Sequence, residues 1–313
     1  MRRTRSVGDD EVSFKEGGEM KRRIVTVAAV VAALVAATVA FAVTNGVPDG
    51  NNHPYVGLMV AQDAGGNPLW RCSGTLVSST VFLTAGHCTA ADEGGDVAHA
   101  EIWFDKGPIL TDSHYTSKAA GGTGCDNPAV TGYPCHGDAG GTPHTNPLYK
   151  SPDNPYGGGN GLPAFSYRDV GVVKLSAAHT MSTYGALPTA GQIDTLKSKT
   201  AVDFVGYGVS RQVMAYPGQS PYDRWTGPKE RLFAPSELVS GNFVNSAEYM
   251  RLALNPGGGS GGTCFGDSGG PDLLGGTNTV LSVNSYVTNS NCRGVGYSAR
   301  VDIPAVLTWI NSF

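Results

Sequence analysis

The sequence predicts an all-β protein that ends in one short helix. Short apolar or alternating runs recur along the chain, separated by Gly, Asn, Ser and Pro, which is the pattern of strands and turns. Charged residues make up only 15% of the 313 residues and glycine occurs 44 times, a composition that suits a secreted β-rich domain better than a helical one. A single helical segment follows the last run. This order favours β-barrels or β-sandwiches.

The predicted strands are short. In chain order they cover residues 55–60, 69–77, 81–83, 170–175, 201–205, 279–287 and 296–301. The helix covers residues 303–311, with Pro304 in its first turn, where the missing N–H of proline costs no hydrogen bond.

The amino terminus predicts export. Residues 21–23 (KRR) are basic, residues 24–41 are apolar, and residues 40–42 (AFA) have the small-x-small form of a signal-peptidase site. We therefore expect residues 20–42 to be a signal peptide and the protein to be secreted. The alternative is an uncut membrane anchor, because an apolar run of about 20 residues can span a bilayer.

Residues 1–19 are charged and patternless, and they precede the basic part of the signal peptide. The segment Lys15-Glu16-Gly17-Gly18-Glu19 would be encoded by purine-rich codons. We hypothesise that it is a translated ribosome-binding site in a bacterial gene and that Met20 is the true start. Residues 1–19 are then an upstream extension outside the fold, and a peptide from them in the expressed protein would refute this.

Composition disfavours some partners and restricts the cysteine chemistry. The formal net charge of −4 shows no basic excess, so we do not expect nucleic acid as a partner. Nothing in the sequence indicates a cofactor. The six cysteines are compatible with disulfides in an exported chain, and the residues alone leave their pairing open.

The segment GDSGGP, Gly266 to Pro271, places Ser268 among glycines. Glycines let a substrate backbone come close and let backbone N–H groups point at one spot, as an oxyanion hole requires. Gly-x-Ser-x-Gly is also the nucleophile elbow of α/β-hydrolases, in which the catalytic histidine follows the serine. The last histidine of this chain is His179, which excludes that fold.

Two further motifs precede the serine. TAGHC (residues 84–88) contains His87, and RDVGVVKL (residues 168–175) contains Asp169 at the start of a predicted strand. A serine hydroxyl needs a base to take its proton, and an imidazole needs a carboxylate to fix its tautomer. With these three motifs in the order His, Asp, Ser, the chain resembles the chymotrypsin-like (trypsin-fold) serine proteases from Val43 to Ile310, as a secreted bacterial-type member.

The resemblance implies a serine endopeptidase with an acyl-enzyme intermediate, built from two six-stranded antiparallel β-barrels over about residues 43–175 and 190–300. Ser268 is then the nucleophile, His87 the general base and Asp169 its orienting carboxylate, while the N–H groups of Gly266 and Ser268 are the oxyanion donors. Asp138 and Asp153 lie in glycine- and proline-rich surroundings, and we expect them to be solvated.

The resemblance also implies a substrate pocket. Gly262, six residues before the serine, matches its base, and Ser285, Tyr286 and Val287 match one wall, with Ser285 also supporting the aspartate. Without an aspartate at position 262 we do not expect cleavage after Arg or Lys. The branched Val287 stands where many relatives have glycine, so we expect protein or peptide substrates with small or medium apolar side chains before the cleaved bond.

Residues 43–46 (VTNG) resemble the freshly cut Ile/Val-x-x-Gly terminus of the family. There the new ammonium pairs with the aspartate before the catalytic serine, which here is Asp267. Because no pro-segment separates Ala42 from Val43, we hypothesise that signal peptidase itself generates the activating terminus. Thr44 departs from the commoner valine, and the alternative is that these residues are only the start of the mature chain.

The resemblance pairs four of the cysteines and leaves one local pair, giving Cys72–Cys88, Cys264–Cys292 and Cys125–Cys135. The last pair lies in an apparent insertion over residues 118–165, which we expect to be irregular surface structure. The alternative is a flap that narrows substrate choice. His136 and His144 lie near these cysteines, which suggests a zinc site as an alternative. Paired cysteines of a secreted chain favour a disulfide, however, so we expect no metal.

Two other classes of function stay open. One is a protease-fold binding protein without activity, which the intact motifs disfavour. The other is a membrane-retained, zymogen-like form, which fractionation of cells and medium would distinguish from secretion. For the secreted enzyme we expect a monomer with no stable membrane association after signal cleavage.

Overall fold

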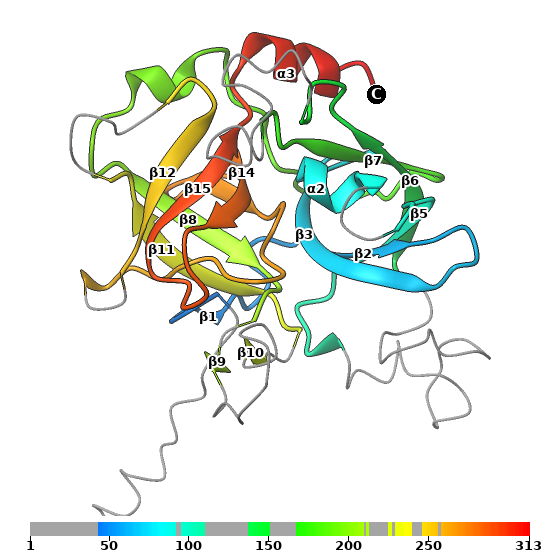
Figure 1. The fold of residues 1–313 in the computed structure, drawn as a ribbon, viewed down its shortest axis with the longest axis horizontal. Helices are drawn as coiled ribbons and strands as arrows, with labels where there is room; N and C mark the ends of the chain where they lie inside the picture. Colours follow the sequence, from blue (N-terminus) through cyan, green and yellow to red (C-terminus); the bar gives the residue numbers. More distant parts are fainter. Residues whose placement is uncertain are drawn as a thin grey trace, which may run out of the picture. The chain divides into compact units, whose positions relative to one another are not determined.

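The described part of the chain is almost entirely β-structure, as predicted. The computed structural model describes residues 43–91, 95–109, 137–150, 167–209, 211–212, 225–226, 229–239, 246–255 and 258–313. Its strands form a closed barrel, a second larger sheet and one small two-stranded sheet, and α3 (Pro304–Ile310) follows the last strand (Figure 1).

Six antiparallel strands close the first barrel in the order β2-β3-β4-β7-β6-β5. The strands are β2 (Val56–Gln62), β3 (Pro68–Ser78), β4 (Val81–Thr84), β5 (His99–Trp103), β6 (Ala139–Thr145) and β7 (Gly171–Leu175). Closure gives every strand a partner on both sides, so no edge is left unpaired. All seven residues of β2 are buried, which explains why this stretch reads as a continuous apolar run.

The second sheet has seven antiparallel strands in the order β1-β11-β8-β13-β14-β15-β12. They are β1 (Val47–Pro48), β8 (Ala201–Gly206), β11 (Leu232–Glu237), β12 (Tyr249–Leu254), β13 (Pro271–Leu274), β14 (Val280–Val287) and β15 (Gly294–Arg300). A bridge between Leu238 and Leu252 joins the β11 side to β12, so the sheet curls toward closure. The small sheet pairs β9 (Arg211–Gln212) with β10 (Trp225–Thr226).

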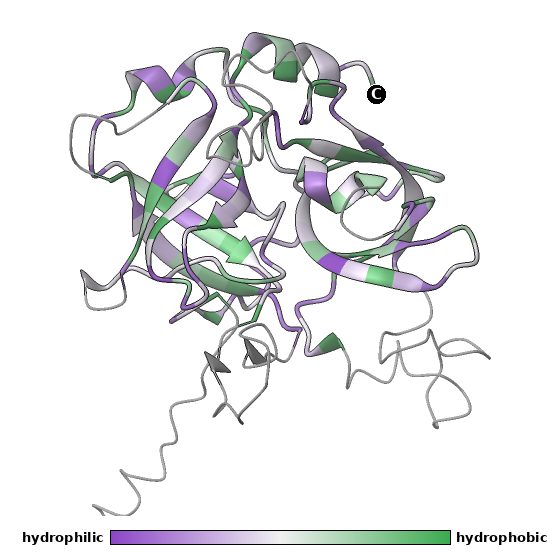
Figure 2. Cartoon of the chain, viewed as in Figure 1, coloured by the Kyte–Doolittle hydropathy of each residue, from purple (hydrophilic) through white to green (hydrophobic). Residues whose placement is uncertain are grey.

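The core follows the alternation expected of half-buried strands. In β8 the buried residues Val202 and Phe204 alternate with Asp203, and hydrophobic colour recurs along this strand (Figure 2). Val202 and Phe204 belong, with Leu252 of β12, to an apolar cluster that also includes Val43 at the start of the described chain. The burial of Val43 shows that the first described residue is part of the core.

The structure contains strands that the sequence ranges did not include, among them β5, β11, β12 and β13, and it differs from the expected organisation in two further respects. Residues 139–145 lie within the segment expected to be an irregular insertion, yet they form β6, a full strand of the first barrel that pairs with both β5 and β7. The run contains two glycines and a proline, which are depleted in strands, so residue propensities do not predict a strand here. In addition, β1 pairs with β11, so the amino-terminal segment joins the second sheet and the first barrel begins at Val56.

The carboxyl-terminal helix connects the two halves. The buried side chains of Val306 and Ile310 in α3 belong to the same core cluster as Val172 and Val173 of β7. Proline stands at the start of the helix, as expected. Among the described residues no helix is long and apolar enough to span a membrane, and the apolar run 24–41 lies outside them.

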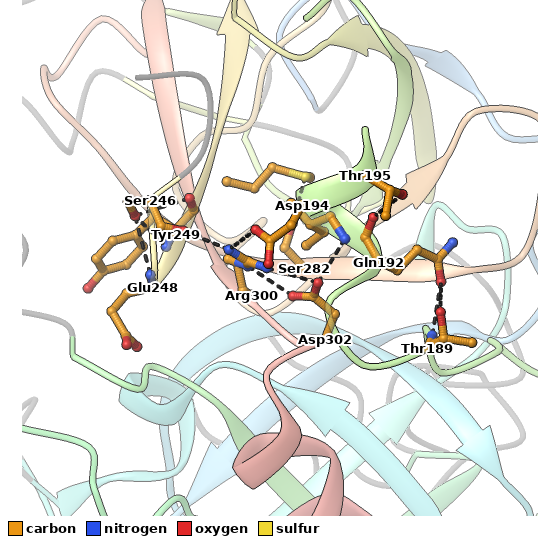
Figure 3. Close-up of polar contacts among 12 residues, drawn as sticks. Thr189, Gln192, Asp194, Thr195, Ser246, Glu248, Tyr249, Ser282, Arg300 and Asp302 are labelled. Atoms are coloured by element: carbon orange, nitrogen blue, oxygen red, sulfur yellow. Dashed lines mark hydrogen bonds and ion pairs between the residues drawn. The ribbon is translucent and has the colours of Figure 1, made fainter. Parts of the chain in front are cut away.

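Two buried arginines hold loops onto this framework. The guanidinium of Arg300 in β15 donates to both carboxylate oxygens of Asp302, at 2.9 and 3.0 Å, and to the carbonyl of Ser246 at 2.8 Å, while Asp194 lies 2.8 Å away (Figure 3). Asp302 also accepts the backbone N–H of Ile193, at the 3-10 helix η5 (Gln192–Thr195). These contacts fix η5 and the start of β12 against β15.

The second arginine, Arg231, is fully buried at the start of β11. Its Nε donates to Asp49 at 2.9 Å, and its Nη1 donates to the carbonyls of Val56 at 3.1 Å and Phe104 at 2.9 Å. Because a buried guanidinium must find partners for its donors, these bonds determine where residues 49–56 cross from the second sheet to the first barrel.

Candidate active site

His87 and Asp169 meet although they are 82 residues apart in the sequence. His87 lies on α2 (Gly86–Thr89), a single turn that follows β4, and Asp169 lies just before β7, the barrel neighbour of β4. The His87 Nδ1 is 2.9 Å from Oδ2 of Asp169, and the His87 backbone N–H donates to Oδ1 at 2.8 Å. The backbone contact fixes the carboxylate in a position to orient the ring.

The Asp169 carboxylate is fully buried and receives a third donor, the hydroxyl of Ser285, at 2.5 Å from Oδ2. Burial raises the pKa of Asp169, but the neighbouring His87 and the hydrogen bonds from His87 and Ser285 outweigh it, so that its pKa lies below the usual value. A carboxylate that stays ionised keeps the proton of the imidazole on Nδ1, which leaves the lone pair of Nε2 as the basic site.

The loop around Ser268 is held between the two halves of the molecule. The carbonyl of Ser268 accepts the backbone N–H of Ser73 at 2.8 Å, and the carbonyl of Gly266 accepts the Ser73 hydroxyl at 2.9 Å. On the other side the N–H of Gly269 donates to the carbonyl of Asn284 at 2.8 Å. Ser268 therefore sits where β3 of the barrel faces β14 of the second sheet.

Glycine is required in this loop by both conformation and space. Gly266 has φ +93° and Gly269 has φ +76°, a region that residues with a side chain rarely adopt. A Cβ on Gly269 would also lie 2.0 Å from Oγ1 of Thr84, the first residue of the TAGHC motif. The close approach of these two motifs brings Ser268 next to the turn that carries His87.

The two disulfides of the described residues flank the site. Cys72–Cys88 joins β3 to α2, and its sulfurs lie within 4.8 Å of a ring nitrogen of His87. Cys264–Cys292 joins the segment before Ser268 to the turn between β14 and β15. Both are the predicted pairs, whereas Cys125 and Cys135 lie outside the described residues.

A pocket of about 250 Å³ opens beside Ser268. The predicted wall residues Ser285, Tyr286 and Val287 line it, and Val287 stands directly opposite Gly296 across the β14–β15 pair. The pocket is also lined by four residues that were not predicted and that adjoin the predicted ones in the sequence: Thr263, Cys264, Phe265 and Asn284. Only their adjacency to the motifs could have indicated them.

Gly262, which was expected at the base of the pocket, is not among the residues that line it. It is buried, and its backbone pairs with that of Thr44. A Cβ on Gly262 would lie 2.9 Å from the Thr44 hydroxyl oxygen and 3.1 Å from Cβ of Leu254, so the chain packs tightly there. None of the residues that line the pocket is charged.

Asp267 is buried and forms no direct ion pair with the described residues. Its Oδ1 accepts the N–H of Gly208 at 2.8 Å and its Oδ2 accepts the N–H of Cys264 at 2.9 Å. Burial raises the pKa of Asp267 to about 7, against the lowering by these hydrogen bonds and by Arg71. An added positive group at this place would be strongly stabilised.

The other sequence candidates lie away from this centre or beyond the described residues. His144 in β6 packs against the ring of Phe313, with ring centroids 4.9 Å apart, and Asp138 is exposed while it accepts the N–H of Phe104 at 2.6 Å. His136 and Asp153 lie outside the described residues. The sulfurs near His87 belong to a disulfide, which leaves no thiolate there to bind a metal.

Several solved structures share this architecture. The chain is similar to HL collagenase, with a TM-score of 0.57, 16% identity, and coverage of 86% of this chain and 97% of that one. It is also similar to human heparin binding protein, with a TM-score of 0.55, 16% identity, and coverage of 86% and 96%. For the protein GrC the TM-score is 0.54 and the identity 15%, with coverage of 86% and 98%.

At the level of sequence, no family model and no curated protein matches the chain. The similarity to solved structures therefore concerns the fold. Those structures have the chymotrypsin-like serine protease fold, and the closed barrel, the curled second sheet and the terminal helix of this chain correspond to it. The chain has the trypsin-like two-sheet fold.

Proposed function

We propose that the protein is a serine endopeptidase in which Ser268 is the nucleophile, His87 the general base and acid, and Asp169 the group that orients His87. The observation that carries this proposal is the hydrogen-bonded series Ser285–Asp169–His87 beside Ser268 and its pocket. Fold alone does not imply function, whereas a buried carboxylate that fixes the tautomer of a partly exposed imidazole has a specific chemical use.

The reaction would proceed in two balanced halves. Nε2 of His87 takes the proton of the Ser268 hydroxyl as Oγ bonds to the peptide carbonyl carbon, and the N–H groups of Gly266 and Ser268 stabilise the oxyanion. The imidazolium, stabilised by Asp169, then gives this proton to the amine as the C–N bond breaks. A water molecule repeats the sequence on the acyl-enzyme, releasing the acid and restoring the Ser268 hydroxyl.

The pocket would accept the side chain before the cleaved bond. Val287 narrows it, and none of its lining residues offers a negative charge to a cationic side chain. Small or medium apolar residues would therefore fit, and Arg or Lys would not. The natural substrates would be proteins or peptides.

Processing at Ala42–Val43 would activate the enzyme. Val43 is buried and has φ +52°, an unfavourable conformation for a β-branched residue in an intact chain. A cut before Val43 removes that dihedral restriction and creates an α-ammonium group, which would supply the direct ion pair that buried Asp267 does not form with the described residues. This supports the view that signal peptidase generates the active terminus.

The remaining context also belongs to the proposal. We infer a secreted, bacterial-type protein that acts as a monomer, with residues 1–19 outside the fold, residues 20–42 as signal peptide, and a third disulfide between Cys125 and Cys135. Disulfides persist in oxidising compartments, and the two seen here are compatible with export. A purely binding role, of the kind named for human heparin binding protein, would not need the Ser285–Asp169–His87 series.

Covalent labelling tests this proposal directly. A fluorophosphonate probe should react with one serine only, and peptide mapping by mass spectrometry should locate the adduct on Ser268. The matched variant Thr263→Ala, which changes a neighbouring pocket hydroxyl, should still be labelled, while Ser268→Ala should not. Labelling that is absent from the processed protein, or equal in Ser268→Ala, would contradict the assignment.

A further inference from the structure

Arg71, on β3, lies against the loop that carries Ser268. A Cβ placed on Gly266 would be 2.8 Å from Nε of Arg71 and 3.5 Å from its Nη2. The guanidinium is thus in contact range of the backbone that is proposed to bind the oxyanion. Arg71 is only partly buried, so part of the side chain is accessible to solvent and to a ligand.

Arg71 lies on the side of the site where the leaving group would depart. Arg71 is not among the residues that line the pocket for the acyl side. It directly precedes Cys72, whose disulfide to Cys88 lies within 4.8 Å of a ring nitrogen of His87. Because His87 must protonate the departing amine, the chain after the cleaved bond has to pass close to His87 and this disulfide. Arg71 therefore flanks that path.

The side chain of Arg71 makes no hydrogen bond or ion pair with the described residues, although its charge acts on the buried Asp267 and lowers the pKa of that carboxyl. The nearby carboxylate of Asp267 is buried, and its oxygens are engaged by the N–H groups of Gly208 and Cys264. A second cation, Lys229, interacts electrostatically with Arg71. Burial, the larger cause, and the charge of Arg71, the smaller one, lower the pKa of Lys229 to about 8.

We propose that Arg71 binds a carboxylate of the substrate on the leaving-group side, so that the protein prefers Asp or Glu in one of the first two positions after the cleaved bond. This inference rests on the proposed function, since it assigns a substrate feature to the same site. Arginine suits the role because its planar guanidinium can donate two parallel hydrogen bonds to one carboxylate.

The test compares matched peptides that carry a C-terminal amide and contain Asp, Asn or Lys at the first or second position after the cleaved bond. Binding is measured by fluorescence anisotropy on the processed protein with Ser268→Ala, and kcat/KM is measured on the active protein. We expect Asp to be favoured over Asn by about fivefold to tenfold, with the preference weakening at high salt. Arg71→Gln should abolish the preference, and Arg71→Glu should turn it toward Lys.

Arg251→Gln, which removes an arginine of β12, is the control and should keep the preference for Asp. Equal binding of Asp and Asn peptides, or a preference that survives in Arg71→Gln, would overturn the proposal. The carboxylate that Arg71 binds could also be the C-terminus of the peptide. A peptide with a neutral residue at these positions and a free C-terminal carboxylate tests this, and tighter binding of that peptide alone would also overturn the assignment to Asp and Glu side chains. If no peptide is hydrolysed the proposed function fails, while the binding data still decide the role of Arg71.

Discussion

The backbones of Thr44 and Gly262 form two hydrogen bonds, from Thr44 N–H to the Gly262 carbonyl at 2.7 Å and from Gly262 N–H to the Thr44 carbonyl at 2.9 Å. This pairing ties the first described residues to the segment that leads to Ser268. It also places the buried Val43 in the second sheet's core. The chemistry of the amino terminus and the shape of the site are therefore coupled through a few backbone contacts.

Adding one glycine between Ala42 and Val43 should reduce activity even if the signal peptide is still removed. The new α-ammonium would be displaced from the buried site, leaving Asp267 without a counter-ion, a loss that typically costs about 3–5 kcal/mol. We expect kcat/KM to fall on the order of a hundredfold or more. Amino-terminal sequencing of the secreted protein, together with peptide hydrolysis on the same sample, measures this.

A matched control inserts one glycine between Gly65 and Gly66, in the exposed turn between β2 and β3, and should leave the activity unchanged. Full activity of the chain extended before Val43 would show that the site forms without the ion pair.

Substitutions of Asp169 and Ser285 should differ strongly in effect. Asp169→Asn keeps the shape but presents the wrong tautomer of His87, and we expect kcat to fall roughly 10⁴-fold. Ser285→Ala removes one of several hydrogen bonds to the carboxylate, and a hydrogen bond to a charged group is worth about 1.5–3 kcal/mol, so a loss of about tenfold to a hundredfold is expected. Comparing kcat of the two variants, with thermal unfolding as a check on folding, tests this order; equal losses would contradict it.

Val287→Gly should widen the pocket. Val287 lines the pocket opposite Gly296, so removal of its side chain opens space between β14 and β15. We expect kcat/KM for substrates with Phe before the cleaved bond to rise at least about tenfold relative to Ala, since a few methylene groups in an apolar pocket are worth about 1–3 kcal/mol. A peptide series of Ala, Val, Leu and Phe gives the ratio. An unchanged ratio would mean that Val287 does not limit the pocket.

Asp272 should make stability depend on pH. Burial raises the pKa of this carboxyl from 3.8 to about 7, and the hydroxyls of Ser282 and Ser298 oppose the rise only in part. The folded state therefore holds a proton that the unfolded state has lost. The resulting stabilisation is complete below pH 3.8 and disappears as the pH rises through 7.

Asp272→Asn removes this dependence, because asparagine does not titrate. We compare the Tm of the variant with the Tm of the unchanged protein at pH 4 and at pH 8. The difference between the two Tm values should shift in favour of the variant by several degrees when the pH is raised from 4 to 8. Thermal unfolding at both pH values, carried out with Ser268→Ala in both chains to prevent self-digestion, gives the difference. A difference in Tm that does not change with pH would show that Asp272 is already ionised near its usual pKa.

Much of the site was accessible from sequence because its chemistry is local. TAGHC, RDVGVVKL and GDSGGP each fix one side chain within a short turn, and the structure brings His87 and Asp169 into direct contact. The two disulfides in the described residues follow the predicted pairing. The catalytic assignment of Ser268 itself stays a prediction until its reactivity is measured.

Other features depend on contacts between distant segments, which sequence patterns do not encode. The strand β6 contains glycines and a proline and forms because β5 and β7 both pair with it. Arg71 looks like an ordinary strand residue until Gly266 is found beside it. Likewise, nothing in the neighbourhood of Asp272 in the sequence indicates that it is fully buried.

The rate of peptide hydrolysis by the processed protein, with and without Ser268→Ala, decides whether Ser268 is the nucleophile. A rapid-mixing experiment with a peptide ester should show a burst of one leaving group per protein molecule, followed by slower turnover, as an acyl-enzyme requires. The Ser268→Ala protein, confirmed as folded by its unfolding transition, should show neither the burst nor more than about a thousandth of the turnover. Equal hydrolysis by both proteins would show that Ser268 is not the nucleophile.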